Sequence, residues 1–365
     1  MNRTKITHLT SVHPQNDNRI FYKECMSLQQ EYYDVSLIVA GGETRNINGI
    51  QVIGYLKSNG GRLKRILKTS FLEMIRECKK VDADIYHFHD PELIFTGLYL
   101  KFLGKKVIYD IHENNPASIL SKPYIKSKLV KKVISRIFDL FEKGTARFFD
   151  AIVTARPDIS ERFKHKQLIT LRNFPILPNM SKIKDINLIK TKPSVIFVGG
   201  MSSIRGIPEL IEAFALIPDI ELWLLGPIKE KKIEESIKIQ DNIRYFGIVE
   251  AYDVWSYIDR ADIGIITFLP LPNHVQTLAT KPFEYMACAK PMIMSNFTYW
   301  EEVFGDSSFY VDPTDVRSIA ETIKKLIEDK ILRDTMGKRN LALSQNEYNW
   351  NIESQKLIAL YKELS

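Results

Sequence analysis

A lysine and a glutamate stand three residues apart at the start of an expected helix, where they could bind an anion and hydroxyl groups. The stretch Thr277–Asn296 (TLATKPFEYMACAKPMIMSN) is typical of a loop, a helix and a buried strand. Thr280 can cap this helix and Pro282 suits its first turn. Lys281 and Glu284 would then lie where helix N–H groups and the helix dipole attract phosphate. An ordinary Lys/Glu pair on a surface helix would have the same spacing.

A glycine-rich turn offers a second place for an anion. The segment Val198–Gly206 (VGGMSSIRG) follows an expected strand and precedes an expected helix, Ile207–Leu216. The backbone could approach a phosphate at its three glycines, which are Gly199, Gly200 and Gly206. Arg205 could hold that phosphate with a bidentate fork, and Lys281 could bring a second cation to the same diphosphate. The turn is neither GxGxxG nor a P-loop, so nicotinamide and ATP-hydrolase chemistry are not indicated.

The size and composition of the chain are those of a soluble two-domain protein. It has 365 residues, 45% of them apolar and 26% charged. No run approaches the ~20 apolar residues that a membrane span needs. The N-terminus lacks the apolar core of a signal peptide, and the three scattered cysteines form no CxxC pair. We therefore expect a cytoplasmic protein, with a possible peripheral position at the inner face of the cytoplasmic membrane.

Positive charge is concentrated in the first half of the chain. The net charge is +7, and residues 1–178 carry 29 Lys and Arg against 18 Asp and Glu. Residues 179–365 carry 22 against 26, so the second half is acidic. This asymmetry suggests an anionic partner for the first half.

Short apolar runs alternate with amphipathic stretches over most of the chain. In the first half the runs predict strands at Lys5–Val12, Asp34–Ala40, Ile50–Tyr55, Asp84–His89, Lys106–Ile111, Ala151–Thr154 and Leu168–Leu171. In the second half they predict strands at Ser194–Val198, Glu221–Leu225, Ile243–Phe246, Ile263–Thr267, Met292–Met294 and Phe309–Val311. Continuous apolar strands separated by helices predict an α/β protein with doubly wound parallel sheets.

A proline-containing segment interrupts this alternation and predicts a domain boundary. We expect one Rossmann-like domain at residues 1–178, a linker at 179–193 and a second Rossmann-like domain at 194–344. The amphipathic tail, residues 345–365, is expected to pack back on the first domain. Two such domains facing each other would form a cleft lined by the carboxyl ends of both sheets.

Several motifs resemble those of one enzyme family. FVGGMSSIRGIPELIEAF, followed by TLATKPFEYMACAKPMIMSN, is similar to the donor half of retaining family-4 glycosyltransferases with the GT-B fold. TSVHPQNDNRIFYKE, YHFHDPEL and VIYDIHE resemble the branch of that family that assembles bacterial surface polysaccharides. The resemblance covers essentially the whole chain.

On the donor side, the resemblance implies roles for individual residues. Glu284 matches the glutamate that binds the nucleotide ribose, and Gln276 stands where the family has a glutamate directed at the donor sugar. Arg205 takes the place of the family's phosphate-binding lysine. The family's phosphate-binding arginine is missing, so Lys281 is expected to supply the second charge. Phe246, at the end of an expected strand, completes the expected nucleotide-sugar set with the three glycines.

The resemblance also assigns His112, which follows the strand Lys106–Ile111, to the histidine placed over the donor sugar. A structural histidine at a strand end is the alternative. Asp110 and Glu113 flank it, and one of them could orient its imidazole. The expected catalytic residues are therefore His112, Arg205 and Lys281.

Polar residues after other strands of the first half lie at the same expected edge of the sheet. They could line the acceptor side, and the residues in question are Asp17, Arg19, His89, Asp90 and Glu113. His87 would point the same way as His89. Metal binding by His87, His89 and Asp90 is conceivable, but no distant further ligand is evident, so we expect no metal site.

A basic helix, Lys122–Arg136, carries six cations and no acidic residue. It could be an ordinary solvated helix face or a peripheral surface for anionic lipid. Nucleic acid is not expected as a partner, because aromatic residues do not alternate with the cations.

The sequence therefore predicts a retaining, metal-independent glycosyltransferase without a cofactor. It would move a sugar from a nucleotide donor, expected to be a UDP-sugar, to a polysaccharide or lipid-linked saccharide. Two alternatives remain open, a UDP-sugar 2-epimerase and a non-catalytic protein that binds nucleotide sugars.

Overall fold

The computed structural model describes residues 3–58, 60–122, 124–180, 183, 186, 188–250 and 252–365. The chain divides into two compact units. The first comprises Met1–Asn173 together with Trp350–Ser365, and the second is Phe174–Asn349. The expected linker, residues 179–193, thus falls within the second unit. Among the described residues, no helix is long and apolar enough to cross a membrane.

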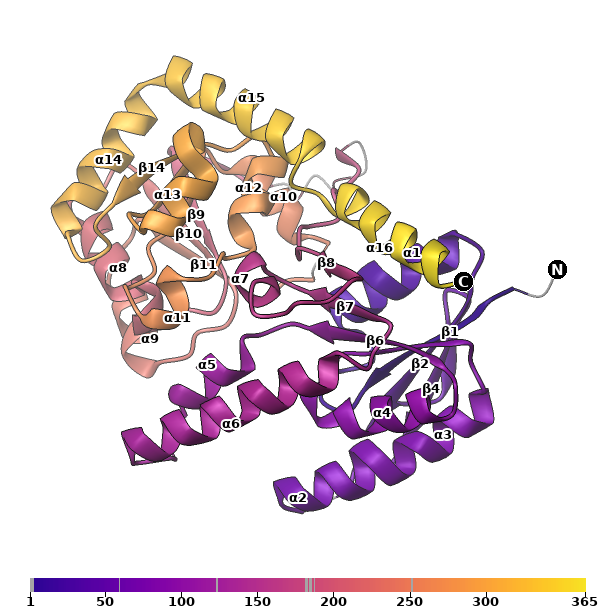
Figure 1. Ribbon diagram of the computed structural model, residues 1–365. Coiled ribbons are helices and arrows are strands. Elements are labelled where there is room, and N and C mark those ends of the chain that lie inside the picture. Colours follow the sequence, from indigo (N-terminus) through magenta and orange to yellow (C-terminus); the bar gives the residue numbers. More distant parts are fainter. Residues whose placement is uncertain are drawn as a thin grey trace. The chain divides into compact units, whose positions relative to one another are not determined.

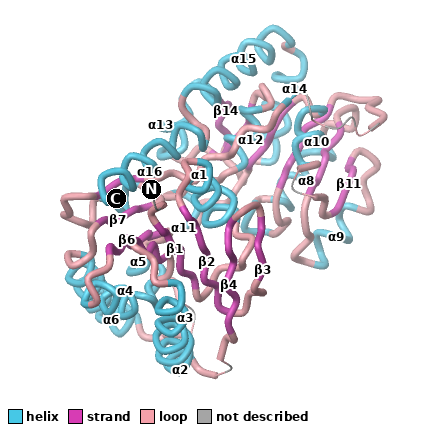
Figure 2. The backbone as a smooth tube through the Cα atoms, turned by 90° about the vertical axis from the view of Figure 1, so that its right-hand side faces the viewer, coloured by secondary structure: helices cyan, strands magenta, loops and turns pink. Residues whose placement is uncertain are grey.

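The first unit is built on an eight-stranded sheet with the order β3-β4-β2-β1-β5-β6-β7-β8. Figure 2 shows β1, β2, β4 and β3 side by side. The strands are β1 (Lys5–Thr10), β2 (Asp34–Ala40), β3 (Arg45–Ile47), β4 (Ile50–Tyr55), β5 (Ile85–Phe88), β6 (Lys106–Ile111), β7 (Ala151–Thr154) and β8 (Leu168–Thr170). All neighbours are parallel except β3 and β4, which form an antiparallel hairpin.

Helices cover both faces of this sheet because its strands are apolar on both sides. One face packs against the π-helix η1 (Asn18–Cys25), α1 (Met26–Gln30) and the C-terminal helix α16 (Trp350–Leu364). Figure 1 shows α16, in yellow, beside α1. The other face is covered by α2 (Arg62–Lys64), η2 (Arg65–Glu73), α3 (Met74–Val81), η3 (Pro91–Leu93), α4 (Ile94–Phe102) and α6 (Lys128–Ala146). Two further helices are α5 (Asn115–Leu120) and α7 (Pro157–Ser160).

The second unit has a six-stranded parallel sheet with the order β11-β10-β9-β12-β13-β14. Its strands are β9 (Ser194–Val198), β10 (Glu221–Leu225), β11 (Ile243–Gly247), β12 (Ile263–Ile266), β13 (Met292–Ser295) and β14 (Ser308–Val311). Alternate strand residues face two apolar layers, which explains why these strands read as continuous apolar runs. The predicted α/β class with two doubly wound parallel sheets is confirmed.

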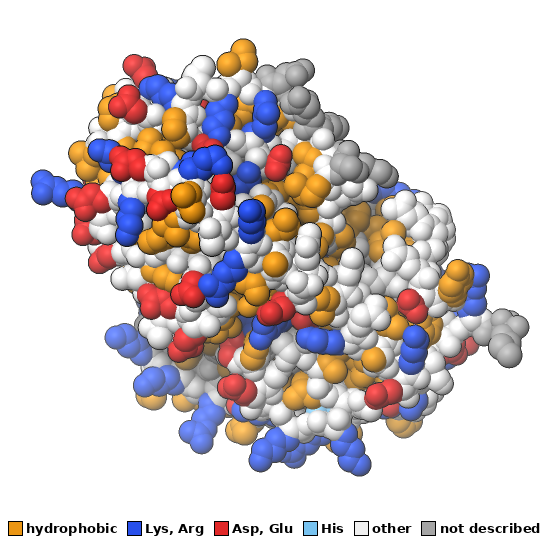
Figure 3. Space-filling view, turned by 90° about the horizontal axis from the view of Figure 1, so that it is seen from above, with side chains coloured by type: hydrophobic (Ala, Val, Ile, Leu, Met, Phe, Trp, Pro, Cys, Tyr) orange, Lys and Arg blue, Asp and Glu red, His pale blue; other side chains and the backbone are white. Residues whose placement is uncertain are grey.

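One layer of the second unit contains α8 (Ile207–Ala215), α9 (Lys231–Ile237), α14 (Val316–Glu328) and part of α15 (Lys330–Asn346). The opposite layer contains α10 (Val254–Arg260), α12 (Lys281–Ala287) and α13 (Thr298–Phe304). Short elements η5 (Ser203–Arg205), α11 (Pro272–Val275) and η6 (Gly305–Ser307) lie in the connecting loops. On the face drawn in Figure 3, acidic and basic side chains are interspersed.

Candidate functional site

The loop after β9 is held tightly against the loop after β12. Gly206 has a φ of +69°, and a Cβ added to it would lie 1.8 Å from the carbonyl oxygen of Thr267. The amide of Leu269 donates a 3.1 Å hydrogen bond to the carbonyl of Ile204. Only glycine suits Gly206, because its conformation is left-handed and the neighbouring backbone leaves no room for a side chain. This packing fixes the start of α8 at the carboxyl edge of the sheet.

Arg205 lies over this loop with its charged group against an aromatic ring. Its Nη1 donates a 3.2 Å hydrogen bond to the carbonyl of Gly200, and its guanidinium lies 5.3 Å from the ring centroid of Phe268. Partial burial lowers the pKa of Arg205 from its usual value, but arginine remains a cation at neutral pH. The structure therefore places a positioned positive charge at the glycine-rich turn, as the sequence predicted.

A second cation at this turn was missed by sequence reasoning. Lys229, in the loop after β10, has its Cε 3.4 Å from the position that a Cβ on Gly200 would occupy. Arg205 Nη1 lies 3.7 Å from the same position. The two cations flank Gly200 from two different strand-to-helix loops. The available signal was Pro227-Ile-Lys229 directly after the strand Glu221–Leu225, at the same edge of the sheet.

Lys281 and Glu284 form an ion pair within the first turn of α12. The Nζ atom of Lys281 lies 2.7 Å from both carboxylate oxygens of Glu284. The residue that the structure brings next to Arg205 is thus Lys229, whereas Lys281 contacts Glu284. The expected phosphate role of Lys281 stays a prediction.

Tyr285 fixes the start of α12 against the end of β9. Its buried hydroxyl donates to the carbonyl of Ile196 at 3.2 Å and accepts from the amide of Val198 at 3.1 Å. Its ring occupies the space above Gly264, where an added Cβ would lie 2.3 Å from a ring atom. Glu284, the residue before it, is consequently presented at the edge where the loop after β9 begins.

The two remaining donor-side predictions are Gln276 and Phe246. Gln276 is exposed and directly follows α11. Phe246 is half-buried near the end of β11, with its ring 4.8 Å from that of Tyr257. The guanidinium of Arg244 lies 5.3 Å from the Phe246 ring centroid. The structure therefore explains Phe246 through local packing, and its contact with a nucleotide stays a prediction.

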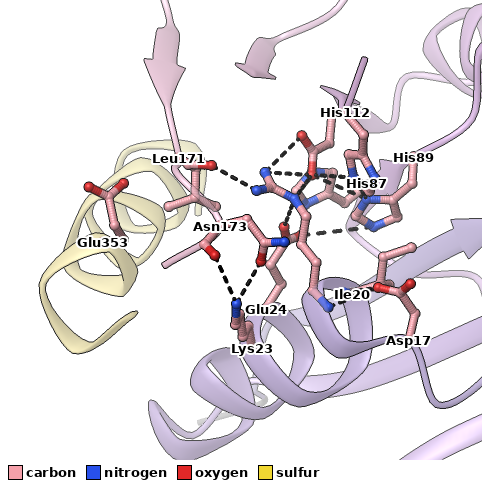
Figure 4. Close-up of polar contacts among 12 residues, drawn as sticks. Asp17, Ile20, Lys23, Glu24, His87, His89, His112, Leu171, Asn173 and Glu353 are labelled. Carbon is pink, nitrogen blue, oxygen red and sulfur yellow. Dashed lines mark hydrogen bonds and ion pairs between the residues drawn. The ribbon is translucent and has the colours of Figure 1, made fainter. Parts of the chain in front are cut away.

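In the first unit, His112 is anchored by a buried carboxylate (Figure 4). Its Nε2 lies 3.0 Å from Asp110 Oδ2 and 3.2 Å from Nδ1 of His89. Asp110 therefore orients the imidazole, while Glu113 is exposed and accepts a hydrogen bond from Ser118. Of the two carboxylates that flank His112, Asp110 is therefore the one that orients its imidazole. The role of His112 toward a donor sugar stays a prediction.

Asp110 is itself held by Arg19, which enters from the π-helix η1. Burial alone would raise the pKa of Asp110, but the Arg19 guanidinium and His112 hold that pKa well below its usual range. Arg19 also donates a 2.7 Å hydrogen bond to the carbonyl of Leu171. Because π-helical bonding joins residues five apart, it places Arg19 and Glu24 on the same inward face. Their closest atoms, Nε and Oε1, are 3.0 Å apart.

Three expected acceptor-side residues prove to be buried, which corrects that prediction. Arg19 is 5% exposed, and His89 and Asp90 are each 2% exposed. Asp90 Oδ2 accepts hydrogen bonds from the Thr10 hydroxyl and from the amides of Ser11 and Val12. These side chains hold the strand ends together instead of lining a surface, because polar groups on inner strands must find partners inside the protein.

Asp17 and Glu113 are the two expected acceptor-side residues that reach solvent. Asp17 caps the π-helix η1, accepting hydrogen bonds from the amides of Arg19 and Ile20 at 2.8 and 2.9 Å. Its other carboxylate oxygen lies 3.5 Å from Nδ1 of His13. His13 was not among the predicted site residues.

The sequence of the second unit matches a known enzyme family. Residues 179–342 match the family described as glycosyl transferases group 1. These residues form a group 1 glycosyltransferase domain. The glycine-rich turn, Arg205, Lys229, Lys281 and Glu284 all belong to it.

Two curated relatives of this chain are named for bacterial surface polysaccharides. The chain is 26% identical to the capsular polysaccharide biosynthesis glycosyltransferase CapM of Staphylococcus aureus over 202 residues, covering 53% of this chain and 52% of CapM. It is 27% identical to the O-antigen chain mannosyltransferase B of Escherichia coli over 277 residues, covering 70% of this chain and 67% of that enzyme. The match to CapM thus spans about half the length of CapM.

The chain has the fold of the GT-B glycosyltransferases. Anabaena HepE, whose structure was solved in complex with UDP, is similar over 99% of this chain and all of HepE, with a TM-score of 0.71. The sequence identity is 14%, so this likeness supports the fold alone.

Proposed function

We propose that this protein is a glycosyltransferase whose group 1 domain binds the diphosphate of a nucleotide sugar at the glycine-rich turn. One observation carries the proposal. In a domain of this family, Arg205 and Lys229 flank Gly200 from two loops at the carboxyl edge of one parallel sheet. Cations at that edge are suited to a diphosphate. Lys229 supplies the charge that the missing family arginine would have provided.

The same arrangement supports group transfer from the anomeric carbon. When the bond to the sugar breaks, negative charge develops on the leaving diphosphate, and fixed cations stabilise it. Arg205 is pre-positioned by Gly200 and Phe268, so little reorganisation is needed during the reaction. No DxD pair stands in this region of the sequence, so we propose chemistry without a metal ion at the phosphates. Retention of anomeric configuration is proposed from the resemblance to family 4.

The proposed donor is a UDP-sugar and the proposed acceptor is a surface polysaccharide or its lipid-linked precursor. Anabaena HepE, which shares the fold, binds UDP, and CapM is named for capsule synthesis. The ribose of the nucleotide is assigned to Glu284, whose carboxylate is held at the first turn of α12 by Lys281. A carboxylate accepts hydrogen bonds from two vicinal hydroxyls without needing a charge on the ligand.

We further propose that α6 contacts an anionic membrane. This helix begins at Lys128, so Lys122 and Lys126 lie in the preceding loop and not on the expected helix. Apolar side chains of α6 are unusually exposed, with Leu129 at 71% and Leu140 at 64%. Lys128, Lys132 and Arg136 are exposed on the same helix, as are Val130, Val133, Ile134 and Ile137. Apolar and cationic side chains together on one helix suit the interface of an anionic bilayer.

Binding and turnover by the purified full-length chain test the donor assignment. UDP should raise the melting temperature more than GDP does. At 100 times its Kd, UDP should stabilise the folded protein by about 2.7 kcal/mol. Arg205→Ala and Lys229→Ala should each lower the transfer rate by roughly a hundredfold. Lys232→Ala is the matched control, since Lys232 is an exposed lysine three residues further along. Unchanged rates in the first two variants would refute the phosphate assignment.

The products distinguish the remaining alternatives. A transferase releases UDP and glycosylates an acceptor, whereas a 2-epimerase converts the donor into its epimer without any acceptor. A non-catalytic protein binds the nucleotide sugar and does neither. Incubation with a panel of UDP-sugars, followed by separation of the nucleotide products, therefore separates all three.

A further inference from the structure

Four ionisable side chains meet in the interior of the first unit. They come from three elements and are His8 of β1, Glu24 of η1, His87 of β5 and His89, which directly follows β5. We call these four residues the histidine cluster, and Figure 4 labels Glu24, His87 and His89 among them. His8 and His87 are register partners on adjacent parallel strands. Each of the four offers one nitrogen or oxygen atom, and these atoms all lie within 4.8 Å of one another.

We propose that the histidine cluster binds one divalent metal ion of the zinc type. Three imidazoles and one carboxylate match the ligand types that Zn²⁺ prefers, and four protein ligands make a closed, structural site. The proposal concerns the stability of the first unit and does not depend on the glycosyltransferase assignment.

Two distances within the histidine cluster fit metal–ligand bonds better than hydrogen bonds. Glu24 Oε2 lies 3.9 Å from Nδ1 of His8 and 3.9 Å from Nε2 of His89. These separations are too long for hydrogen bonds. Two Zn–ligand bonds of about 2.0–2.2 Å span up to about 4 Å, and ligand atoms at tetrahedral angles are about 3.4 Å apart. An ion between these atoms would therefore contact all three.

One distance must change when the ion enters. Nδ1 of His8 and Nε2 of His89 are 2.9 Å apart, which is a hydrogen bond and slightly short for two ligands of one tetrahedral ion. Metal binding replaces this hydrogen bond, and its proton moves to the other ring nitrogen of His8, Nε2, which lies 3.4 Å from the hydroxyl of Tyr361. Nδ1 of His8 and Nε2 of His89 then both have a lone pair for the ion. The two rings need to separate by only a few tenths of an ångström.

Unpartnered polar atoms point to the same conclusion. Among the described residues, Oε2 of Glu24 and Nε2 of His87 are buried without a hydrogen bond, whereas Oε1 of Glu24 is paired with Nε of Arg19 at 3.0 Å. Glu24 and His87 are 0% exposed. A buried polar atom without a partner costs free energy, and a buried carboxylate costs more. A bound cation gives these atoms a partner.

The charges around the histidine cluster also call for a cation. Arg19 is shared between Asp110 and Glu24, with Nε 3.2 Å from Asp110 Oδ2 and 3.0 Å from Glu24 Oε1. One guanidinium therefore faces two buried carboxylates. A proton on Glu24 is the competing way to balance the charge, but it leaves His87 Nε2 without a partner.

Each proposed ligand is also oriented by a second contact, as metal ligands usually are. The other nitrogen of His87, Nδ1, lies 2.8 Å from the hydroxyl of Tyr361 on α16. Nδ1 of His89 lies 3.2 Å from His112 and 3.3 Å from Asp110. Arg19 holds the far oxygen of Glu24. Nε2 of His8 lies 3.4 Å from the same Tyr361 hydroxyl. These contacts leave Nδ1 of His8, Nε2 of His87, Nε2 of His89 and Oε2 of Glu24 for the ion.

Elemental analysis of the full-length protein tests the proposal. After expression in zinc-supplemented medium and gel filtration, we expect one zinc ion per chain, and removal by a chelator should lower the melting temperature. Glu24→Gln and His87→Gln should each lose the ion, and Tyr361→Phe should weaken binding by about 10- to 100-fold. His165→Gln is the matched control, because among the described residues this histidine of the same unit has hydrogen bonds only with the backbone of Gln167 and Phe149.

Wild-type protein alone can overturn the proposal, even where a variant fails to fold. Loading the chelated wild type with Co²⁺ should produce the intense visible absorption of a four-coordinate site. Absence of stoichiometric metal, together with no change of melting temperature on adding Zn²⁺, would show that the histidine cluster is balanced by a proton. Equal metal content in wild type, Glu24→Gln and His87→Gln would place the ion elsewhere.

Discussion

Arg19 and Asp110 form a bidentate ion pair in the interior of the first unit. Nη2 of Arg19 lies 3.1 Å from both carboxylate oxygens of Asp110, and Asp110 is 0% exposed. The π-helix η1 is thereby tied to the end of β6, directly beside His112. Asp110 therefore both orients His112 and stabilises the first unit through its ion pair with Arg19.

Replacement of Asp110 should reveal this connection. In Asp110→Asn the Arg19 guanidinium loses one of its two carboxylate partners and keeps Glu24, and breaking a buried pair costs about 3–5 kcal/mol. Urea unfolding followed by circular dichroism measures the loss. Glu113→Gln is the matched control on the other side of His112, since Glu113 is exposed and its replacement should change stability by less than about 0.5 kcal/mol. Equal stability of the two variants would contradict the structural role of the pair.

Gly206→Ala should destabilise the second unit. The added Cβ would lie 1.8 Å from the Thr267 carbonyl oxygen, on a residue with a φ of +69°. The loss should exceed about 1 kcal/mol, and the affinity for UDP should fall with it. Gly247→Ala separates the two causes, because Gly247 has a φ of +74° and nothing within 4 Å of its added Cβ. If both variants lose the same stability in thermal unfolding, the clash with Thr267 is unimportant.

Glu284→Gln should weaken nucleotide binding more than it slows the bound donor. A carboxylate that accepts ribose hydroxyls acts in both the ground state and the transition state, so KM should rise about tenfold with a small change in kcat. Calorimetric titration with UDP checks the affinity directly. Glu212→Gln, an exposed glutamate on α8, serves as the control. An unchanged UDP affinity in Glu284→Gln would exclude the ribose contact.

His13 should make the stability of the first unit depend on pH. Its interaction with Asp17 raises the pKa of His13 against the opposing effect of burial, and Asp90, 3.4 Å from Nε2, adds to the rise. His112 and Asp110 also face it. Because the folded pKa is raised, this stabilisation is fully present below the unfolded value of about 6.5. It is lost as the pH rises through the folded pKa.

Comparison of wild type with His13→Gln measures this contribution. The difference in unfolding free energy should be about 0.5–1 kcal/mol at pH 5.5, in line with a partly exposed ion pair, and should shrink by pH 8.5. A difference that is constant over this range, or that grows with pH, would show that His13 acts through packing alone.

The α6 surface should bind anionic vesicles in a salt-dependent way. Sedimentation with anionic vesicles should be strong at 0.1 M salt and weak at 1 M, where the Debye length falls from ~10 Å to ~3 Å. Replacement by Gln at Lys126, Lys128, Lys131 and Lys132 should abolish it and leave UDP binding intact. The control replaces four exposed lysines of the second unit, which are Lys231, Lys232, Lys324 and Lys338. Equal sedimentation of the two variants would leave α6 a solvated helix.

Much of the fold follows from local sequence patterns. Every predicted strand is present within one or two residues, because parallel strands buried on both faces need continuous apolar runs. The strand β3 was missed, although Asn48-Gly49, both with positive φ, is a typical hairpin turn before β4. The glycine-rich turn and Arg205 were found for the same reason as the strands, since their signals are local.

The missed and corrected site residues depend on contacts between distant parts of the chain. Lys229 becomes a candidate site residue only because the loop after β10 lies beside Gly200. Arg19 was expected at the surface, but the π-helical winding of η1 turns it toward Asp110, 91 residues away in the sequence. His8 and Glu24 were not noticed because their partners, His87 and His89, lie on another strand. Spacing along the sequence does not show such contacts.

The return of α16 to the first unit has a consequence for how the protein folds during synthesis. One face of the sheet is completed by Trp350, Leu357 and Tyr361, which follow the whole second unit, Phe174–Asn349, in the chain. At about 5–20 residues per second, the ribosome needs roughly 10 to 35 seconds to make that intervening part. During this interval the nascent sheet is without its last covering helix, so the second unit can finish folding first. Chaperones that bind exposed apolar surface would then act on the N-terminal half of the nascent chain.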